Sequence, residues 1–252
     1  MENKKFEITS FVLHIIAMGT MLLDHIYHSG LVNITWFTCV GRLAFPIFAF
    51  MIAEGFHYTK SRKKYALRLL IFAVITEIPF NLVVSGGLFY LPHQNVLWTF
   101  LISVLLLLMY EQIKKEKKAV MWFFAYPIVT VIFMLFALLG MVDYNFIGVL
   151  TVVLFHFTRT EKTDKTSKKV ICGAIQLFVM CMLNVMISSS PDYGIQLAPE
   201  TYLSMQSFAI LALPIIWLYN GRQGYYNKYI KWTYYLFYPV HCLVLGILTL
   251  VF

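Results

Sequence analysis

Long apolar segments follow one another along almost the entire chain, and this feature restricts its fold more than any other. A helix needs about 20 mainly apolar residues to cross the hydrocarbon core of a membrane. Backbone polar groups inside lipid must be hydrogen-bonded within the segment, so such a segment must be helical. The sequence predicts nine spanning segments: 11–29, 36–56, 65–84, 96–113, 119–139, 143–158, 170–188, 203–219 and 232–252. We therefore expect an all-α, polytopic membrane helix bundle that forms a single domain over residues 1–252.

The composition supports a membrane protein. Hydrophobic residues make up 60% of the 252 residues and charged residues only 13%, whereas a typical soluble domain holds about 25% charged residues. The four cysteines, Cys39, Cys172, Cys181 and Cys242, stand singly within apolar segments and lack a C-x-x-C spacing. Neither a disulfide framework nor a thiolate metal site is indicated. The glycine-rich motifs of nucleotide-driven motors are also missing from the sequence.

The basic residues occupy alternate connections between the expected spans. Of the 20 Lys and Arg residues, 19 lie in the N-terminal segment or in and beside the connections that follow the second, fourth, sixth and eighth spans. Cytoplasmic connections of membrane proteins carry an excess of Lys and Arg. We therefore expect a cytoplasmic N-terminus and an outer C-terminus. The net charge of +8 then reflects topology and contact with membrane lipids, and no nucleic-acid partner is expected.

The remaining basic residue, Arg42, lies inside the second expected span, among other polar residues of the outer half of the bundle. A charge at the bilayer centre costs about 2.5–3.5 kcal/mol on insertion scales, and such residues usually face a partner or a wet cavity. A salt bridge between Asp24 and Arg42 would explain only those two residues. The spans and the connection before the fourth span predict a larger polar cluster: Asp24, His25, His28, Arg42, Glu77, Asn81, His93 and Asn95.

Four stretches of the chain are similar to the TraX family. These stretches are "LHIIAMGTMLLDHIYHSG", "VGRLAFPIFAFMIAEGFHYTKSRKKYALRLLIFAVITEIPFNL", "HQNVLWTFLISVLLLL" and the closing "YLFYPVHCLVLGIL". The resemblance is nearly continuous over residues 13–108, whereas residues 115–230 carry little of it. It implies a multi-pass acyltransferase of the bacterial plasma (inner) membrane that moves an acetyl group from cytoplasmic acetyl-CoA to an acceptor on the far side. The activity that gives the family its name is N-terminal acetylation of a conjugative pilin. By this resemblance His25 matches the catalytic histidine and Arg42 the buried arginine.

Together the residues and the resemblance predict a mechanism. His25 is expected to take a proton from an acceptor amine or hydroxyl, which then attacks the thioester; a variant in which His25 is itself acylated stays open. Asp24 lies about 100° from His25 on the helix wheel, so we expect it to pair with Arg42. Glu77 is expected to orient His25, and Arg42, Asn95 or His93 to stabilise the oxyanion.

The remaining predicted roles concern the donor and the acceptor. His241 is expected to line the thioester path, and the other predicted substrate-binding residues are His28, Asn81, His93 and Asn95. The phosphates of the acetyl-CoA donor are expected near Lys60, Arg62, Lys63, Lys64 and Arg222. The acceptor, whether peptide, glycan or small molecule, cannot be identified from the sequence.

Two other classes of protein are compatible with the polar cluster. A proton-coupled transporter also uses intramembrane Asp, His, Arg and Glu residues, although paired helices broken by Gly or Pro are not evident. If the chain were a scaffold protein, the free-energy cost of placing this polar cluster within the membrane would be unexplained. No metal is expected. A site formed by His25, His28 and Asp24 would need three ligands that converge from one helix face, and their spacing does not obviously provide the third.

Overall fold

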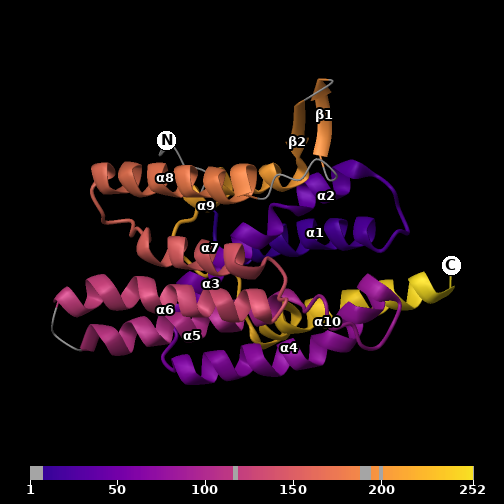
Figure 1. Cartoon of the computed structure of the whole chain (residues 1–252), viewed down its shortest axis with the longest axis horizontal. Coiled ribbons are helices and arrows are strands. Elements are labelled where there is room, and N and C mark those ends of the chain that lie inside the picture. Colours follow the sequence, from indigo (N-terminus) through magenta and orange to yellow (C-terminus); the bar gives the residue numbers. More distant parts are fainter. Residues whose placement is uncertain (1–7, 116–118, 188–193, 199–200, 252) are drawn as a thin grey trace.

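The computed structural model describes residues 8–115, 119–187, 194–198 and 201–251. These residues form an elongated bundle whose helices run mostly along its long axis (Figure 1). The α-helices are α1 (Ser10–His28), α2 (Thr35–Gly41), α3 (Ala44–Tyr58), α4 (Arg62–Ser85), α5 (Val96–Lys115), α6 (Ala119–Leu139), α7 (Asn145–Phe157), α8 (Thr166–Cys181), α9 (Ala212–Trp217) and α10 (Lys228–Val251). A π-helix, Met182–Ile187, extends α8, and a 3-10 helix, Met205–Leu211, precedes α9.

Seven helical segments of the described chain are long and apolar enough to cross a membrane. Their bounds are Ser10–His28, Thr35–Tyr58, Arg62–Ser85, Val96–Lys115, Trp122–Leu139, Thr166–Val185 and Lys228–Val251. The expected sixth and eighth spans are the shorter apolar helices Asn145–Phe157 and Met205–Trp217. At 1.5 Å per residue, a helix as short as α7 covers about 20 Å of a core of about 30 Å. Seven of the nine predicted spans therefore correspond to helices long and apolar enough to cross a membrane, and the predicted count of nine is not confirmed.

Two local features depart from the sequence prediction. The expected second span is divided into α2 and α3 at Arg42 and Leu43. A small antiparallel hairpin, β1 (Gly194–Ala198) and β2 (Thr201–Ser204), precedes the 3-10 helix and projects from the bundle (Figure 1). Within the described residues the fold is thus helical apart from this hairpin, and β2 takes the place where the eighth span was expected to begin.

Backbone hydrogen bonds tie the connections together at each end of the bundle. At one end the Ile8 amide donates to the Leu218 carbonyl at 2.9 Å, and the Ser10 amide donates to the Arg222 carbonyl at 2.9 Å. At the other end the Gln94 amide donates to the Met141 carbonyl at 2.9 Å. We call these the basic end (8–10, 59–61, 158–165 and 218–227) and the opposite end (29–34, 86–95 and 140–144). In Figure 1 the α7–α8 connection lies at the left and the α1–α2 connection at the right.

The core lies between the helices α1, α3, α5 and α7. Phe45 of α3 stacks on Phe100 of α5 and on Tyr144, with ring centroids 5.6 Å and 3.8 Å apart. Gly148 of α7 permits this arrangement, because a Cβ there would lie 2.5 Å from Thr99 Cγ2. Close aromatic packing of this kind holds neighbouring helices at fixed positions and therefore fixes the polar side chains that they carry.

The packing of α10 against α4 depends on Gly246, which leads to a prediction. A Cβ at Gly246 would lie 2.6 Å from Leu82 Cβ and 3.3 Å from the Leu82 carbonyl carbon. Because that backbone cannot move freely, Gly246→Ala is expected to destabilise the protein by about 1–3 kcal/mol. The measurement is the thermal unfolding midpoint in detergent. Gly19→Ala is the matched control, since no atom lies within 4 Å of its added Cβ, and equal midpoints for the two variants would contradict the prediction.

Candidate functional site

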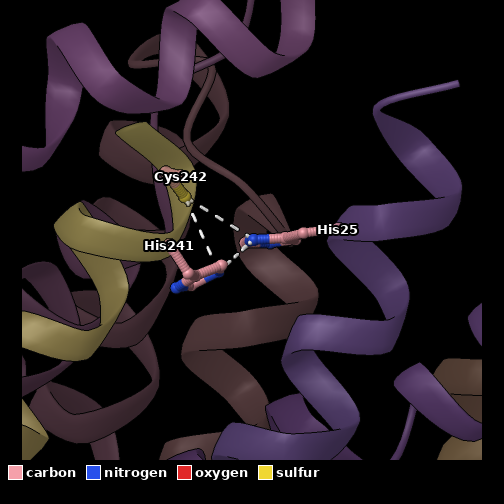
Figure 2. A group of neighbouring side chains, drawn as sticks. All are labelled: His25, His241 and Cys242. Atoms are coloured by element: carbon pink, nitrogen blue, oxygen red, sulfur yellow. Dashed lines mark hydrogen bonds between the residues drawn. The ribbon is translucent and has the colours of Figure 1, made fainter. Parts of the chain in front are cut away.

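Helices α1 and α10 bring His25, His241 and Cys242 together, and His25 lies in the last turn of α1, toward the opposite end of the bundle (Figure 2). His25 Nδ1 lies 2.6 Å from His241 Nε2, and Cys242 Sγ lies 3.6 Å from His25 Nδ1 and 3.8 Å from His241 Nε2. His241 and Cys242 belong to the buried stripe of α10, which repeats with helical spacing from Tyr238 to Gly246. Residues separated by most of the sequence therefore form one polar group.

The hydrogen bonds assign the protons of the two imidazoles. His241 Nδ1 lies 2.6 Å from the Phe237 carbonyl oxygen, and only a protonated nitrogen can donate to a carbonyl. In the neutral ring His241 Nε2 is then an acceptor, so it receives the hydrogen bond from His25 Nδ1. The remaining ring nitrogen, His25 Nε2, keeps its lone pair. The arrangement therefore prepares His25 Nε2 as a base or nucleophile.

Glu77 does not orient His25, so that prediction is wrong. Its Oε2 atom accepts a hydrogen bond of 2.8 Å from Trp98 Nε1 and another from Asn95 Nδ2. Asn95 also donates to the Ala73 carbonyl at 2.9 Å, which uses both protons of its amide. Asn95 therefore has no donor left for an oxyanion, and together with Glu77 it anchors the start of α5 against α4. His241 takes the orienting position instead.

Arg42 lies at the break between α2 and α3 and joins three polar side chains. Its Nη2 donates to His28 Nε2 at 2.7 Å and to Thr38 Oγ1 at 3.0 Å, and it lies 3.6 Å from Asp24 Oδ1. Asp24 Oδ1 also accepts a hydrogen bond of 2.8 Å from Thr38. The expected pairing of Asp24 with Arg42 is present. Arg42 Nε is buried and has no hydrogen-bond partner among the described residues, so one guanidinium donor stays free.

Asn81 and His93 support the connections of the opposite end. Asn81 Nδ2 donates to the Leu88 carbonyl at 3.1 Å, and His93 Nε2 lies 3.3 Å from Asp143 Oδ1. These contacts hold the connection 86–95 onto the bundle and onto the connection 140–144. Asn81 and His93 were predicted to bind substrate. His28, which was also predicted to bind substrate, is held by Arg42. The structure gives all three a positioning contact, and their contact with a substrate stays a prediction.

The His93–Asp143 contact predicts a dependence of stability on pH. The hydrogen bond to Asp143 raises the pKa of His93 above its ordinary value of 6.5. The protonated pair therefore stabilises the fold fully below about pH 6.5, and this contribution is lost as the pH rises through the higher folded-state pKa. With 41% of the His93 side chain exposed, the effect is at most about 1 kcal/mol.

The measurement for this pair compares unfolding midpoints of the wild type and His93→Gln at about pH 6 and about pH 8. We expect the difference between the two proteins to be larger at the lower pH. A difference that grows with pH would refute the assignment.

A cavity of about 700 Å³ runs from the basic end into the bundle. Its mouth includes Tyr58, Thr59, Gly221, Gln223 and Lys231, and its inner lining includes Met18, Met21, Phe48, Val96, Leu97 and Tyr238. Val96 and Leu97 begin α5 at the opposite end, so the cavity extends through most of the bundle. The Tyr238 ring lies 5.7 Å, between centroids, from the rings of His25 and His241. The cavity therefore approaches the histidine pair through Tyr238.

Several predicted ligand residues do not line this cavity. His241 lies behind Tyr238 and bonds His25 instead of lining the path. The five predicted phosphate-binding cations also lie outside the lining, and Arg62 forms an ion pair of 3.0 Å with Glu111. The cations that do line the cavity are Arg68 and Lys231. The sequence predicted no ligand role for either: Lys231 was counted as a topology signal, and Arg68 was placed in a thinner polar set toward the cytoplasm and interpreted as reaching the cytoplasmic face.

The histidine pair and Cys242 also contain the atoms of a possible metal site. Their ligand atoms lie within 4.8 Å of one another, and two imidazole nitrogens with one sulfur suit Zn²⁺. However, Zn–N bonds of about 2.0–2.1 Å place tetrahedral nitrogen ligands about 3.3 Å apart, whereas the two nitrogens here lie 2.6 Å apart. That separation is typical of a hydrogen bond, so we interpret the group as a hydrogen-bonded pair.

Comparison with known proteins identifies the family. The family model described as TraX protein matches residues 10–249. The chain belongs to the TraX family. It is also 29% identical to the probable fimbrial assembly protein FimC, serogroup H1, of Dichelobacter nodosus, in an alignment of 259 positions that covers 96% of each chain. No solved structure matches the chain.

The TraX match gives the histidine pair its context. It extends over both α1 and α10, so His25, Arg42, His241 and Cys242 all lie inside the TraX region. It also includes residues 115–230, where the sequence alone showed little resemblance. The resemblance inferred from the sequence is thus confirmed, and the TraX region includes every described residue that lines the cavity.

Proposed function

We propose that this TraX protein is a membrane-embedded acyltransferase. It moves an acetyl or other acyl group from cytoplasmic acyl-CoA to an amine or hydroxyl of an acceptor on the outer side of the bacterial plasma membrane. The observation that carries the proposal is the hydrogen-bonded histidine pair, in which His25 Nε2 is not used by the contact with His241, beside a cavity that begins at the basic end of the bundle.

The cavity supports a donor that enters from the cytoplasm. Basic connections of membrane proteins usually face the cytoplasm, and the mouth of the cavity lies among them. The aromatic and aliphatic lining between the mouth and Tyr238 suits a long, thin and mostly uncharged group such as the pantetheine arm. The thioester would then lie close to His25 in the last turn of α1, where an acceptor can approach from the opposite end.

The chemistry uses the residues in the following way. His25 Nε2 removes the proton of the acceptor amine or hydroxyl while the acceptor attacks the thioester carbonyl carbon. The free Nε–H of Arg42 donates to the resulting oxyanion. The C–S bond then breaks, and the leaving thiolate takes the proton from His25, which yields the acylated acceptor and free CoA thiol. His241 accepts from His25 Nδ1 throughout and stabilises the charged imidazolium.

The name of the relative suggests a class of acceptor. A probable fimbrial assembly protein that aligns over nearly its full length supports a fibre-forming surface protein as the acceptor for this chain. The amine at the N-terminus of such a subunit is the nucleophile that we propose. Membrane lipids surround the protein, and acetyl-CoA is the proposed donor.

The test is release of CoA thiol from acetyl-CoA by the full chain in detergent, supplied with peptide amines as acceptors. We expect release that depends on both the protein and the acceptor, together with acylated acceptor detected by mass spectrometry. Absence of acetyl-CoA binding, combined with proton-dependent uptake of a solute by vesicles that contain the protein, would instead support a transporter.

A further inference from the structure

Two cations face the cavity from neighbouring helices at the same depth. Arg68 of α4 and Lys231 of α10 both line it. One helical turn further in, Phe72 and Tyr235 stack with their ring centroids 4.9 Å apart. Because both helices run from the basic end toward the opposite end, the residues one turn earlier are also neighbours. The mouth of the cavity thus carries two positive charges on adjoining walls.

Neither cation forms an ion pair with a described residue. Arg68 Nε is buried without a hydrogen-bond partner among the described residues, and its guanidinium lies 5.8 Å from the centroid of the Tyr65 ring. Glu54 is the acidic residue in the described lining, and it is bound to Arg159 at 2.7 Å. An arginine within a membrane helix is costly without a partner, and two like charges repel. The arrangement therefore favours an anionic ligand between them.

We propose that Arg68 and Lys231 bind the diphosphate of the acyl-CoA donor. This inference rests on the proposed acyltransferase function and assigns the donor's anchor to residues other than the five cations predicted from the sequence. Guanidinium and ammonium groups are the usual partners of phosphate oxygens. A diphosphate at the mouth would neutralise both charges and leave the nucleotide at the basic end.

The distance to the histidine pair agrees with this assignment. Lys231 and His241 are ten residues apart on α10, which corresponds to about 15 Å along the helix. An extended pantetheine arm has a comparable length. The lining between these levels is mostly apolar or aromatic, and it includes Phe72, Met18 and Phe48. A donor held by its diphosphate at Arg68 and Lys231 would therefore present its thioester close to Tyr238 and His25.

Binding of desulfo-CoA, which keeps the diphosphate but cannot carry an acyl group, tests the site independently of turnover. Calorimetry on the full chain in phosphatidylcholine nanodiscs is expected to show about tenfold weaker binding for Arg68→Gln and for Lys231→Gln, and about a hundredfold for the double variant. Lys228→Gln is the matched control, because it removes the same charge from α10, one turn before Lys231, at a residue that does not line the cavity. Unchanged binding by the double variant would overturn the assignment.

The uncharged donor acetyl-pantetheine provides a second readout. We expect the double variant to raise KM for acetyl-CoA and to leave KM for acetyl-pantetheine unchanged, since the latter lacks the diphosphate. An equal rise in KM for both donors would show that the cations shape the cavity and do not bind phosphate. If the wild-type protein binds desulfo-CoA but transfers no acyl group, the proposed acyltransferase function is refuted and the anion site is retained.

A lipid headgroup carries the same phosphate chemistry and needs its own comparison. Desulfo-CoA binding is measured in nanodiscs with and without phosphatidylglycerol. If the diphosphate of CoA is the ligand, the affinity is expected to be the same in both. Suppose that phosphatidylglycerol weakens desulfo-CoA binding by the wild type and that this effect of the lipid is absent in the double variant. The cations would then be assigned to lipid phosphate instead.

Discussion

Replacing His25 with alanine is expected to lower the rate of acyl transfer about 10²- to 10⁴-fold, the usual contribution of a general base. The substitution removes the free Nε2 atom that accepts the acceptor's proton and later returns it to the CoA thiol. Binding of desulfo-CoA should stay within about twofold of the wild type, because His25 does not line the cavity. The measurement is the initial rate of thiol release at saturating donor and acceptor.

A control variant and a rescue experiment separate this chemical role from a structural one. His156→Ala removes a histidine that lies beside Phe56 in the last turn of α7, at the basic end, whereas His25 lies toward the opposite end; this variant should transfer at the wild-type rate. Added imidazole should restore part of the activity of His25→Ala, since a small base can occupy the vacated space. Full transfer by His25→Ala without imidazole would remove His25 from the proposed mechanism.

The spanning helices could be predicted from the sequence because lipid imposes a strong local constraint. A run of about 20 apolar residues has to be helical there, and α4 and α5 (62–85 and 96–115) lie within three residues of the predicted 65–84 and 96–113. The hairpin and the short helix α7 were not predicted as such. The apolar residues of α7 satisfy the same hydropathy pattern as a full span, whereas the hairpin falls mainly in a connection that the sequence assigned to no span.

Contacts that depend on depth and helix phase could also be predicted. Asp24 and Arg42 lie at similar depth on sequential helices, and the helix wheel separates Asp24 from His25. Their contact of 3.6 Å follows from these two facts. The break at Arg42 was not predicted, although Gly41 ends α2 and Pro46 lies in the first turn of α3, where proline is tolerated at a helix start.

The pairing of His25 with His241 could not be predicted, because the residues are 216 positions apart and no local pattern specifies which helix packs on α1. Glu77 was preferred as the orienting residue because it has a charge and a suitable depth. The indole of Trp98 and the amide of Asn95 bind Glu77 instead, and both were available in the sequence as donors at the start of α5.

Replacing His241 with leucine is expected to lower kcat about 10²- to 10⁴-fold, a range set by the known cost of losing a residue that fixes a catalytic tautomer. Leucine cannot accept the hydrogen bond from His25 Nδ1, so the His25 ring loses both its orientation and the preference for a free Nε2. His241 does not line the cavity, so KM for acetyl-CoA should change little. Initial rates over a range of acetyl-CoA concentrations separate the two parameters.

His241→Gln distinguishes this positioning role from simple packing. The glutamine Oε1 atom can accept from His25 Nδ1 much as His241 Nε2 does at 2.6 Å, whereas leucine fills the space without an acceptor. We therefore expect glutamine to recover at least about tenfold of the kcat lost with leucine, the effect of restoring one hydrogen bond to a charged ring. Equal kcat values for the two variants, at equal unfolding midpoints, would mean that His241 contributes volume alone and that another group sets the tautomer of His25.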